Sequence, residues 1–283
     1  MTPLRIGGVP EHFNLPWHRL IESGGAERLG VEILWRDYPE GSGAMAAALR
    51  SKELDAAMLL TEGAVAGAVA GGFKIVSLYT ESPLIWGIHV PAASPLRTVA
   101  DLRKRRYAIS RRGSGSHLMA FVHARERGWP TADLELVVVG TLQGAIDAFA
   151  NGTADVFFWE KFMTKPLVDS GLFRRVAEFV APWPAFVVCA ADAALARSGA
   201  LAAALRGAFA SASALAASSD APATIAARYG LDARDVHEWL RATHWASRPG
   251  VGVERIAPAV AQLGALGLIG ADTSAASLLA PLE

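Results

Sequence analysis

Length, charge and cysteine content narrow the class of protein before any motif is considered. The 283 residues are enough for two domains at about 150 residues each. Lys plus Arg and Asp plus Glu number 27 each, so no basic field for nucleic acid or an anionic membrane is indicated. The single cysteine, Cys189, excludes an internal disulfide framework, and its apolar surroundings predict a core position. We therefore expect a small-molecule partner, with no metal and no cofactor.

Two regions of the sequence are considered as a secretory signal and as a membrane-spanning helix: the N-terminus and the alanine-rich stretch after Asp192. Residues 4–9 predict a first strand rather than a secretory signal, which needs a basic start, an apolar stretch and a small-residue cleavage site. We expect a cytoplasmic protein as the chain stands, or a periplasmic one if a leader was removed. The stretch after Asp192 is interrupted by Arg197 and Arg206, so no membrane span is expected there.

The first part of the chain alternates short apolar runs with helical patterns. Such alternation indicates βαβ units and a largely parallel sheet, with ligands beyond the carboxyl ends of the strands. The loops at Glu11, Gly41 and Thr61 should therefore converge. The predicted strands are residues 4–9, 31–38, 55–59, 74–79 and 84–90.

The pattern restarts after Pro95. Strands are expected at residues 107–110, 134–140 and 155–159, and an amphipathic helix at residues 142–150. Two further strands, 173–180 and 185–190, are separated by Pro182-Trp183-Pro184. The remainder is expected to be helical and to return to the first lobe, with helices over 192–217, between Pro222 and Gly230, and over 233–245 after an Asp232 N-cap.

The two halves resemble one another. A helix, a tight turn and a strand led by aspartate occur at residues 44–59 and again at 142–159. Asp55 and Asp155 take the same place in each half, and Glu62 or Glu160 follows. This repetition is common in α/β proteins, but it is consistent with two similar lobes.

A Gly/Ser helix start occurs in each half, at residues 41–43 and 110–117. Glycine lets the backbone approach a ligand, and the free N–H groups of a first helical turn favour a carboxylate, sulfonate or phosphate. The alternative for Ser114 or Ser116 is a plain N-cap with nothing bound. Arg111 or Arg112 can add a fork of donors to the same loop, and the alternative for at least one of the two is a solvated surface position.

Other polar and aromatic residues have two interpretations each. Glu11 and His12 are either an acid–base pair or neighbours that point apart. Three tryptophans, Trp86, Trp159 and Trp183, form either a ligand wall or core. Structural roles are favoured for His18 and His89. His123 follows His117 by six residues, a spacing that is unsuited to sharing a metal ion. Lys161 and Lys165 do not lie in a motif for binding pyridoxal phosphate.

Four stretches resemble a known family. They are Val-Pro-Glu-His-Phe at 9–13, Gly-Ser-Gly-Ser-His-Leu-Met at 113–119, Phe-Trp-Glu-Lys-Phe-Met-Thr-Lys-Pro at 158–166, and Pro-Trp-Pro at 182–184. With the order of elements, they are similar to the type II periplasmic-binding-protein family, in its branch that binds nitrate, sulfonates, taurine and thiamine precursors. Relatives of that branch without a signal peptide are the most similar.

The resemblance implies an α/β fold of two lobes, each a mostly parallel sheet flanked by helices. Lobe I would comprise residues 1–88 and 186–283, and lobe II residues 89–185. A small, anionic organic ligand would lie between the lobes, which would close by hinge motion near residues 84–89 and 185–188.

The resemblance also implies ligand contacts, and it extends to about Trp245. Matching family positions are Glu11, His12, Phe13, Asn14, Gly41, Ser42, Gly43, Thr61, Ser114, Gly115, Ser116, His117, Trp159 and Glu160. To these we add Glu62, Trp86, Arg111, Thr141 and Trp183; no catalytic residue and no metal ligand is predicted.

The expected function is that of an ABC-transporter-type solute-binding protein, with a permease as a possible partner. One alternative is a cytoplasmic enzyme on the same fold, of the thiamine-pyrimidine or menaquinone-pathway type, which the missing leader favours. Against the enzyme stand the lack of a cysteine-rich segment and a first-strand loop unlike that of the menaquinone enzymes. A ligand-sensing module is a third possibility.

Overall fold

The computed structural model describes residues 3–282 and divides the chain into two compact units. Unit 1 comprises Met1–Pro83 and Trp183–Glu283, and unit 2 comprises Leu84–Pro182. The C-terminal region thus returns to unit 1, as its lack of predicted strands indicated. The predicted boundaries, at 88/89 and 185/186, lie a few residues further along the chain than the observed ones.

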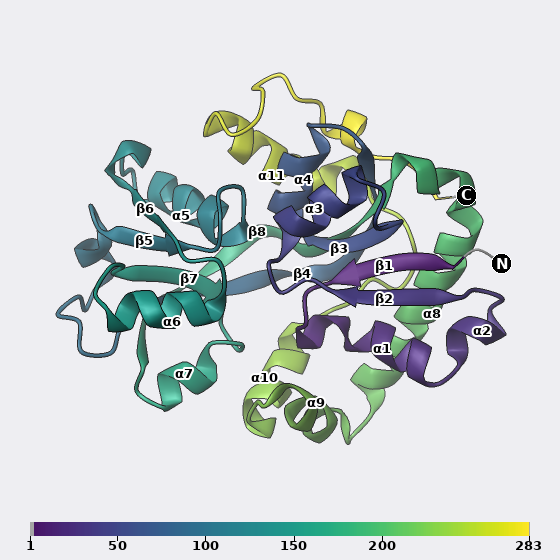
Figure 1. Cartoon of the computed structure of the whole chain (residues 1–283), viewed down its shortest axis with the longest axis horizontal. Helices are drawn as coiled ribbons and strands as arrows, with labels where there is room; N and C mark the ends of the chain where they lie inside the picture. The colour runs from purple at the N-terminus through teal and green to yellow at the C-terminus, as the bar shows by residue number, and fades with distance from the viewer. Residues whose placement is uncertain (1–2, 283) are drawn as a thin grey trace. The chain divides into compact units, whose positions relative to one another are not determined.

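Unit 1 is built on a mixed sheet. Strands β1 (Leu4–Gly8), β2 (Ile33–Asp37) and β3 (Ala56–Leu60) are parallel, with β1 in the middle. The antiparallel neighbour of β3 is β8 (Phe173–Ala191), in which Cys189 is fully buried opposite Ala57. The connecting helices are α1 (Leu15–Glu22), α2 (Gly25–Arg28), α3 (Ser42–Arg50) and α4 (Thr61–Ala68). Figure 1 shows α3 and α4 on one face of these strands and α1 and α2 on the other.

The C-terminal part of unit 1 is helical. It comprises η4 (Asp192–Arg197), α8 (Ser198–Ala217), α9 (Ala221–Tyr229), α10 (Ala233–Ala242), α11 (Val253–Ala265) and η5 (Ala275–Leu278). Gly230, with φ +67°, ends α9, and the Asp232 side chain caps α10 by accepting from the Arg234 N–H, as predicted. The helix predicted over 233–245 ends earlier, at Ala242.

One helical segment, Asp192–Ala217, is long and apolar enough to cross a membrane by length and composition, which differs from the expectation based on Arg197 and Arg206. A core helix passes the same test. In the structure α8 packs against α1, and Leu201, Leu205 and Phe209 are buried. Gly207 permits this packing, because a Cβ there would lie 2.9 Å from a methyl carbon of Leu20 in α1.

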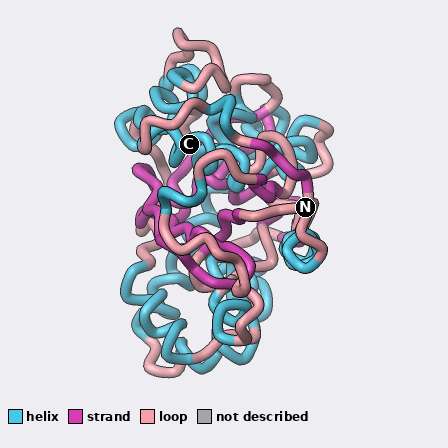
Figure 2. The backbone as a smooth tube through the Cα atoms, turned by 90° about the vertical axis from the view of Figure 1, so that its left-hand side faces the viewer, coloured by secondary structure: helices cyan, strands magenta, loops and turns pink. Residues whose placement is uncertain are grey.

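Unit 2 also contains both parallel and antiparallel strand pairs. β5 (Arg106–Ile109) lies parallel to β6 (Glu135–Val138) and β7 (Val156–Glu160), and β7 is antiparallel to β4 (Phe73–Pro91). The helices are α5 (Gly115–Glu126), α6 (Leu142–Ala150) and the short α7 (Lys165–Asp169), with turns η2 (Val99–Leu102) and η3 (Thr131–Asp133). Helices and strands alternate along the backbone (Figure 2).

Two strands are longer than predicted. β4 and β8 run without interruption through the segments where the sequence suggested pairs of shorter strands. Pro182 and Pro184 remove two N–H groups from β8, but residues two apart point their N–H groups to the same edge, so the other edge can still pair. The predicted break at residues 182–184 is therefore wrong.

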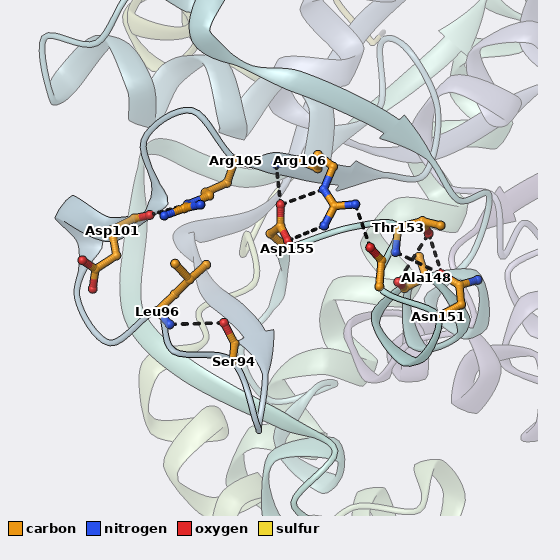
Figure 3. Close-up of polar contacts among 10 residues, drawn as sticks. Ser94, Leu96, Asp101, Arg105, Arg106, Ala148, Asn151, Thr153 and Asp155 are labelled. Atoms are coloured by element: carbon orange, nitrogen blue, oxygen red, sulfur yellow. Dashed lines mark hydrogen bonds and ion pairs between the residues drawn. The ribbon is translucent and has the colours of Figure 1, made fainter.

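The repeated aspartates form the same clasp in both units. Asp55 accepts hydrogen bonds from the Arg5 backbone N–H and guanidinium at 2.8–3.1 Å. Asp155 does the same for Arg106 at 2.7–3.0 Å, and Figure 3 shows its carboxylate facing the Arg106 guanidinium. Each clasp joins the start of one parallel strand to the residue that precedes the neighbouring parallel strand.

Candidate functional site

The loop after β1 is held by β4 and by the C-terminal part of unit 1. It contains η1 (His12–Asn14), and the Phe13 carbonyl accepts hydrogen bonds from Tyr79 Oη at 2.9 Å and Trp245 Nε1 at 3.0 Å. Asn14 Nδ2 donates to the Val9 carbonyl at 2.8 Å, which closes the loop on itself. Sequence reasoning missed Tyr79 and Trp245 because their partner is a backbone carbonyl far away in the chain.

His12 lies in an aromatic box rather than in an acid–base pair. Its ring is 4.1 Å from the Trp239 ring, 4.8 Å from Phe13 and 6.1 Å from Tyr229, and neither ring nitrogen has a hydrogen-bond partner. Burial lowers the pKa of His12 to about 3, so the ring is neutral at pH 7. Burial also raises the pKa of Glu11 to about 7, but no hydrogen bond joins Glu11 to His12.

The starts of α3 and α4 meet, as the predicted convergence of Gly41 and Thr61 requires. Ser42 Oγ accepts the Leu60 N–H at 2.9 Å. A Cβ on Gly63 would lie only 2.8 Å from the Ser42 Cβ, so this approach requires glycine. The Gly41 φ of +78° sets the entry into α3, whose first N–H groups, from Ser42 and Gly43, have no carbonyl one turn earlier to accept them.

The β8 segment at Trp183 and Pro184 packs on the first turn of α4. Thr61 Oγ1 donates to the Pro184 carbonyl at 2.5 Å, and Trp183 Nε1 donates to Glu62 Oε2 at 2.8 Å. Glu62 and Trp183 are both buried, and Glu62 Oε1 has no hydrogen-bond partner. Burial raises the pKa of Glu62 to about 7 because it outweighs the hydrogen bonds from Trp183 and from the backbone.

In unit 2, Ser114 and Ser116 were predicted to bind an anion, but their side chains form hydrogen bonds within the loop before α5. Ser114 Oγ donates to the Arg111 carbonyl at 2.7 Å and accepts the His117 N–H as the N-cap of α5. Ser116 Oγ accepts the Ser110 N–H at 3.0 Å and lies 3.1 Å from Ser114 Oγ. These bonds shape the helix start, whose first N–H groups, from Gly115 and Ser116, have no intrahelical acceptor.

His117 is oriented by the same loop. Its Nδ1 accepts the Gly113 N–H at 3.0 Å, which places the ring proton on Nε2. Burial and, to a smaller extent, the charge of Arg112 lower the pKa of His117. The ring is therefore a neutral Nε2–H donor at the start of α5.

The remaining predicted residues of unit 2 divide between polar and core positions. Trp86 of β4 lies opposite Glu160 of β7 in the strand register. The buried Nε1 of Trp86 has no hydrogen-bond partner. Glu160 Oε2 accepts the Phe162 and Met163 N–H groups at 2.8 and 2.6 Å. Trp159 stacks on Phe157 at 5.1 Å and packs against the core cluster of α6 and β7. Exposed Thr141 caps α6 by accepting the Gly144 N–H, and Arg111 is half-buried.

Residues 3–282 contain no group of three or more His, Cys, Asp or Glu side chains arranged to hold a metal ion. In unit 1, the polar groups beyond the carboxyl end of β3 are hydroxyls and the Glu62 carboxyl. In unit 2, those beyond β5 are hydroxyls, backbone N–H groups and the His117 imidazole. This chemistry suits hydrogen bonding to a small polar molecule.

Comparison with known proteins identifies the fold. A model of the Ca3427-like periplasmic-binding-protein family matches residues 86–179. The Candida albicans CA3427 gene product, described as having the generic periplasmic binding protein fold, superposes with a TM-score of 0.91 at 24% identity, covering 100% of this chain and 98% of that one. No curated protein matches the chain in sequence.

Two other solved structures share the fold at lower identity. The alkanesulfonate-binding protein SsuA from Xanthomonas axonopodis pv. citri, bound to MOPS, has a TM-score of 0.82 at 22% identity, over 99% of both chains. PhnD1 from Prochlorococcus marinus, in complex with methylphosphonate, has a TM-score of 0.65 at 12% identity, over 94% of this chain and 98% of that one. The chain thus has the α/β periplasmic-binding-protein fold that the sequence resemblance implied.

Proposed function

We propose that the protein is a solute-binding protein for a small organic anion, of the type that delivers its ligand to an ABC permease. The fold supports solute binding, and solved structures that share it include sulfonate- and phosphonate-bound proteins. A ligand-binding component of an ABC-type import system from Staphylococcus aureus also shares it, with a TM-score of 0.76.

The observation that carries the proposal is the start of α5. The N–H groups of Gly115 and Ser116 precede any intrahelical partner, and the neutral His117 adds an Nε2–H donor beside them. Three donors and a helix dipole of the same sign favour an acceptor-only group such as a sulfonate, phosphonate or carboxylate. The internal bonds of Ser114 and Ser116 hold these donors in place before the ligand arrives.

Ligand capture by hinge closure is part of the proposal. The chain passes between the units at 83/84, within β4, and at 182/183, within β8. We expect the hinge near residues 84–89 and 185–188, which lie in these two strands.

Substitution of His117 tests the α5 subsite. His117→Phe should weaken binding of ethanesulfonate about tenfold, because one hydrogen bond to a charged group is lost, whereas His117→Gln, which keeps an N–H donor, should retain most of the affinity. Isothermal titration calorimetry measures both, with the exposed His237→Phe as the matched control. Wild-type affinity in His117→Phe would remove this residue from the site.

A further inference from the structure

Trp86 of unit 2 carries a buried hydrogen-bond donor that the packing around it does not satisfy. The side chain is 3% exposed, and its indole Nε1 has no hydrogen-bond partner among the described residues. The indole of Trp183, by comparison, donates to Glu62 at 2.8 Å. A buried N–H without an acceptor costs free energy, so such groups are usually satisfied by another side chain, water or a ligand.

The strand register places Trp86 on the face of the unit 2 strands that α5 covers. Side chains alternate between the two faces along a strand, and α5 and α6 lie on opposite faces (Figure 1). Phe158 of β7 faces α5, because its ring lies 5.3 Å from that of His123 in α5. Glu160 is two residues further along β7, so it points to the same face, and Trp86 lies directly opposite Glu160 in the antiparallel pair.

The neighbouring tryptophan, Trp159, points to the other face. It stacks on Phe157 and packs against the core cluster that includes Phe149 of α6. Trp86 and Trp159 therefore have different surroundings, although they lie on adjacent strands at the same end.

Trp86 and the start of α5 also lie at the same end of the strands. Glu160, opposite Trp86, is the last residue of β7. β7 is parallel to β5, and the loop after β5 leads to Gly115, the first residue of α5. Because the carboxyl ends of parallel strands lie at one edge, the Trp86 side chain and the first N–H groups of α5 share both a face and an end of these strands.

We propose that Trp86 is a specificity-determining residue of the α5 subsite, whose indole N–H donates to the anionic group bound by Gly115, Ser116 and His117. The proposal rests on the function proposed above and adds a donor from a different strand of the same unit. An ionised acid accepts at two or more oxygens, so it can take bonds from α5 and from Trp86 at once.

The indole resonance of Trp86 tests this bond directly. The chain has eight tryptophans, and each gives one indole signal in a proton–nitrogen correlation spectrum. Saturating ethanesulfonate, or ethylphosphonate or propionate if it does not bind, should move the Trp86 signal downfield, because a hydrogen bond to an anion deshields the proton. The Trp159 signal should stay nearly unchanged. Trp86→Phe assigns the signal by its loss, and sequential assignment of the wild-type chain replaces it if that variant does not fold.

Affinity provides a second readout. Trp86→Phe should weaken binding of the same ligand about tenfold, as expected for one hydrogen bond to a charged group. Trp159→Phe is the matched control, because it makes the same change on the opposite face, and it should bind with wild-type affinity. Isothermal titration calorimetry on the full chain measures both variants.

The outcomes separate the two proposals. If a ligand binds and His117→Phe weakens it, but the Trp86 signal does not move, the inference is overturned while the α5 subsite stands. Equal losses of affinity in Trp86→Phe and Trp159→Phe would also overturn it, since packing and not the N–H group would then explain them. If none of the three ligands binds, the solute-binding proposal itself falls, and the inference falls with it.

Discussion

The buried histidines show how differently one residue type is used in this fold. His89 is satisfied, with Nε2 3.0 Å from Thr164 Oγ1 and Nδ1 3.3 Å from the Phe157 carbonyl. His123 is not, because it is enclosed by Trp129, Phe158 and Phe179 at 5.3–5.6 Å and neither nitrogen has a partner. Burial lowers the pKa of His123 to about 4, so its imidazole is neutral at pH 7.

Replacing His123 should therefore stabilise the protein in acid. The histidine binds a proton more readily when unfolded, so its contribution to stability is present above pH 6.5 and is lost as the pH falls toward 4. His123→Leu should remove about 2 kcal/mol of the loss in unfolding free energy between pH 7.5 and pH 5. Urea denaturation at both pH values measures it, with exposed His237→Leu as control. An unchanged pH dependence would contradict the proposed neutrality of His123.

At the scale of elements, the arginine–aspartate clasps tie the start of each central strand to its neighbour. The two are not equal, because Asp55 is 7% exposed and also pairs with Arg197 at 2.7 Å, whereas Asp155 is 25% exposed and pairs with Arg106. In each unit the clasp lies at the amino end of the parallel strands, away from the loops of the candidate site.

Substitution of each aspartate should show this difference. Asp55→Asn leaves two arginines without their buried carboxylate and should cost about 3 kcal/mol, while Asp155→Asn should cost about 1 kcal/mol because its pair is more solvent-exposed. The free energy of unfolding in urea measures both, and neither change should alter ligand affinity. Equal costs would show that the burial of Asp55 and its second arginine add nothing.

Elements were predictable where local signals decide them. The Asp232 N-cap, the Gly230 C-cap and the apolar stripe of α6 each specify a helix end or face within a few residues. The continuity of β4 and β8 was not predictable, because prolines mark breaks in sequence and only the pairing partners show that the ladder continues. The short α7 was also missed, since five residues carry no periodic signal.

The loops of the candidate site could be predicted from the sequence, but the contacts of their side chains could not. The loops after β1, β3 and β5 were predicted from the rule for parallel sheets, and each of them follows the carboxyl end of its strand. The bonds of Ser114 and Ser116 to their own loop, and the packing of Trp159 into the core, depend on local geometry that residue type does not determine. The link from Trp245 to the Phe13 carbonyl joins residues 232 positions apart.

At the scale of the whole molecule, the net charge of zero is the sum of a positive unit and a negative unit. Unit 2 contains 13 Lys and Arg against 9 Asp and Glu, a net charge of +4, and unit 1 contains 14 against 18, a net charge of −4. The proposed anion subsite at α5 lies in unit 2, whose net charge of +4 favours an anionic ligand.

The central claim is that the native protein binds a small organic anion. Its most direct test is a thermal-shift titration of the wild-type chain with ethanesulfonate, ethylphosphonate, propionate and their 2-amino counterparts. A ligand at about 100 times its Kd adds about 2.7 kcal/mol to the free energy of unfolding, so at least one of them should raise Tm by several degrees in a saturable manner. An unchanged Tm across the whole panel would contradict the claim.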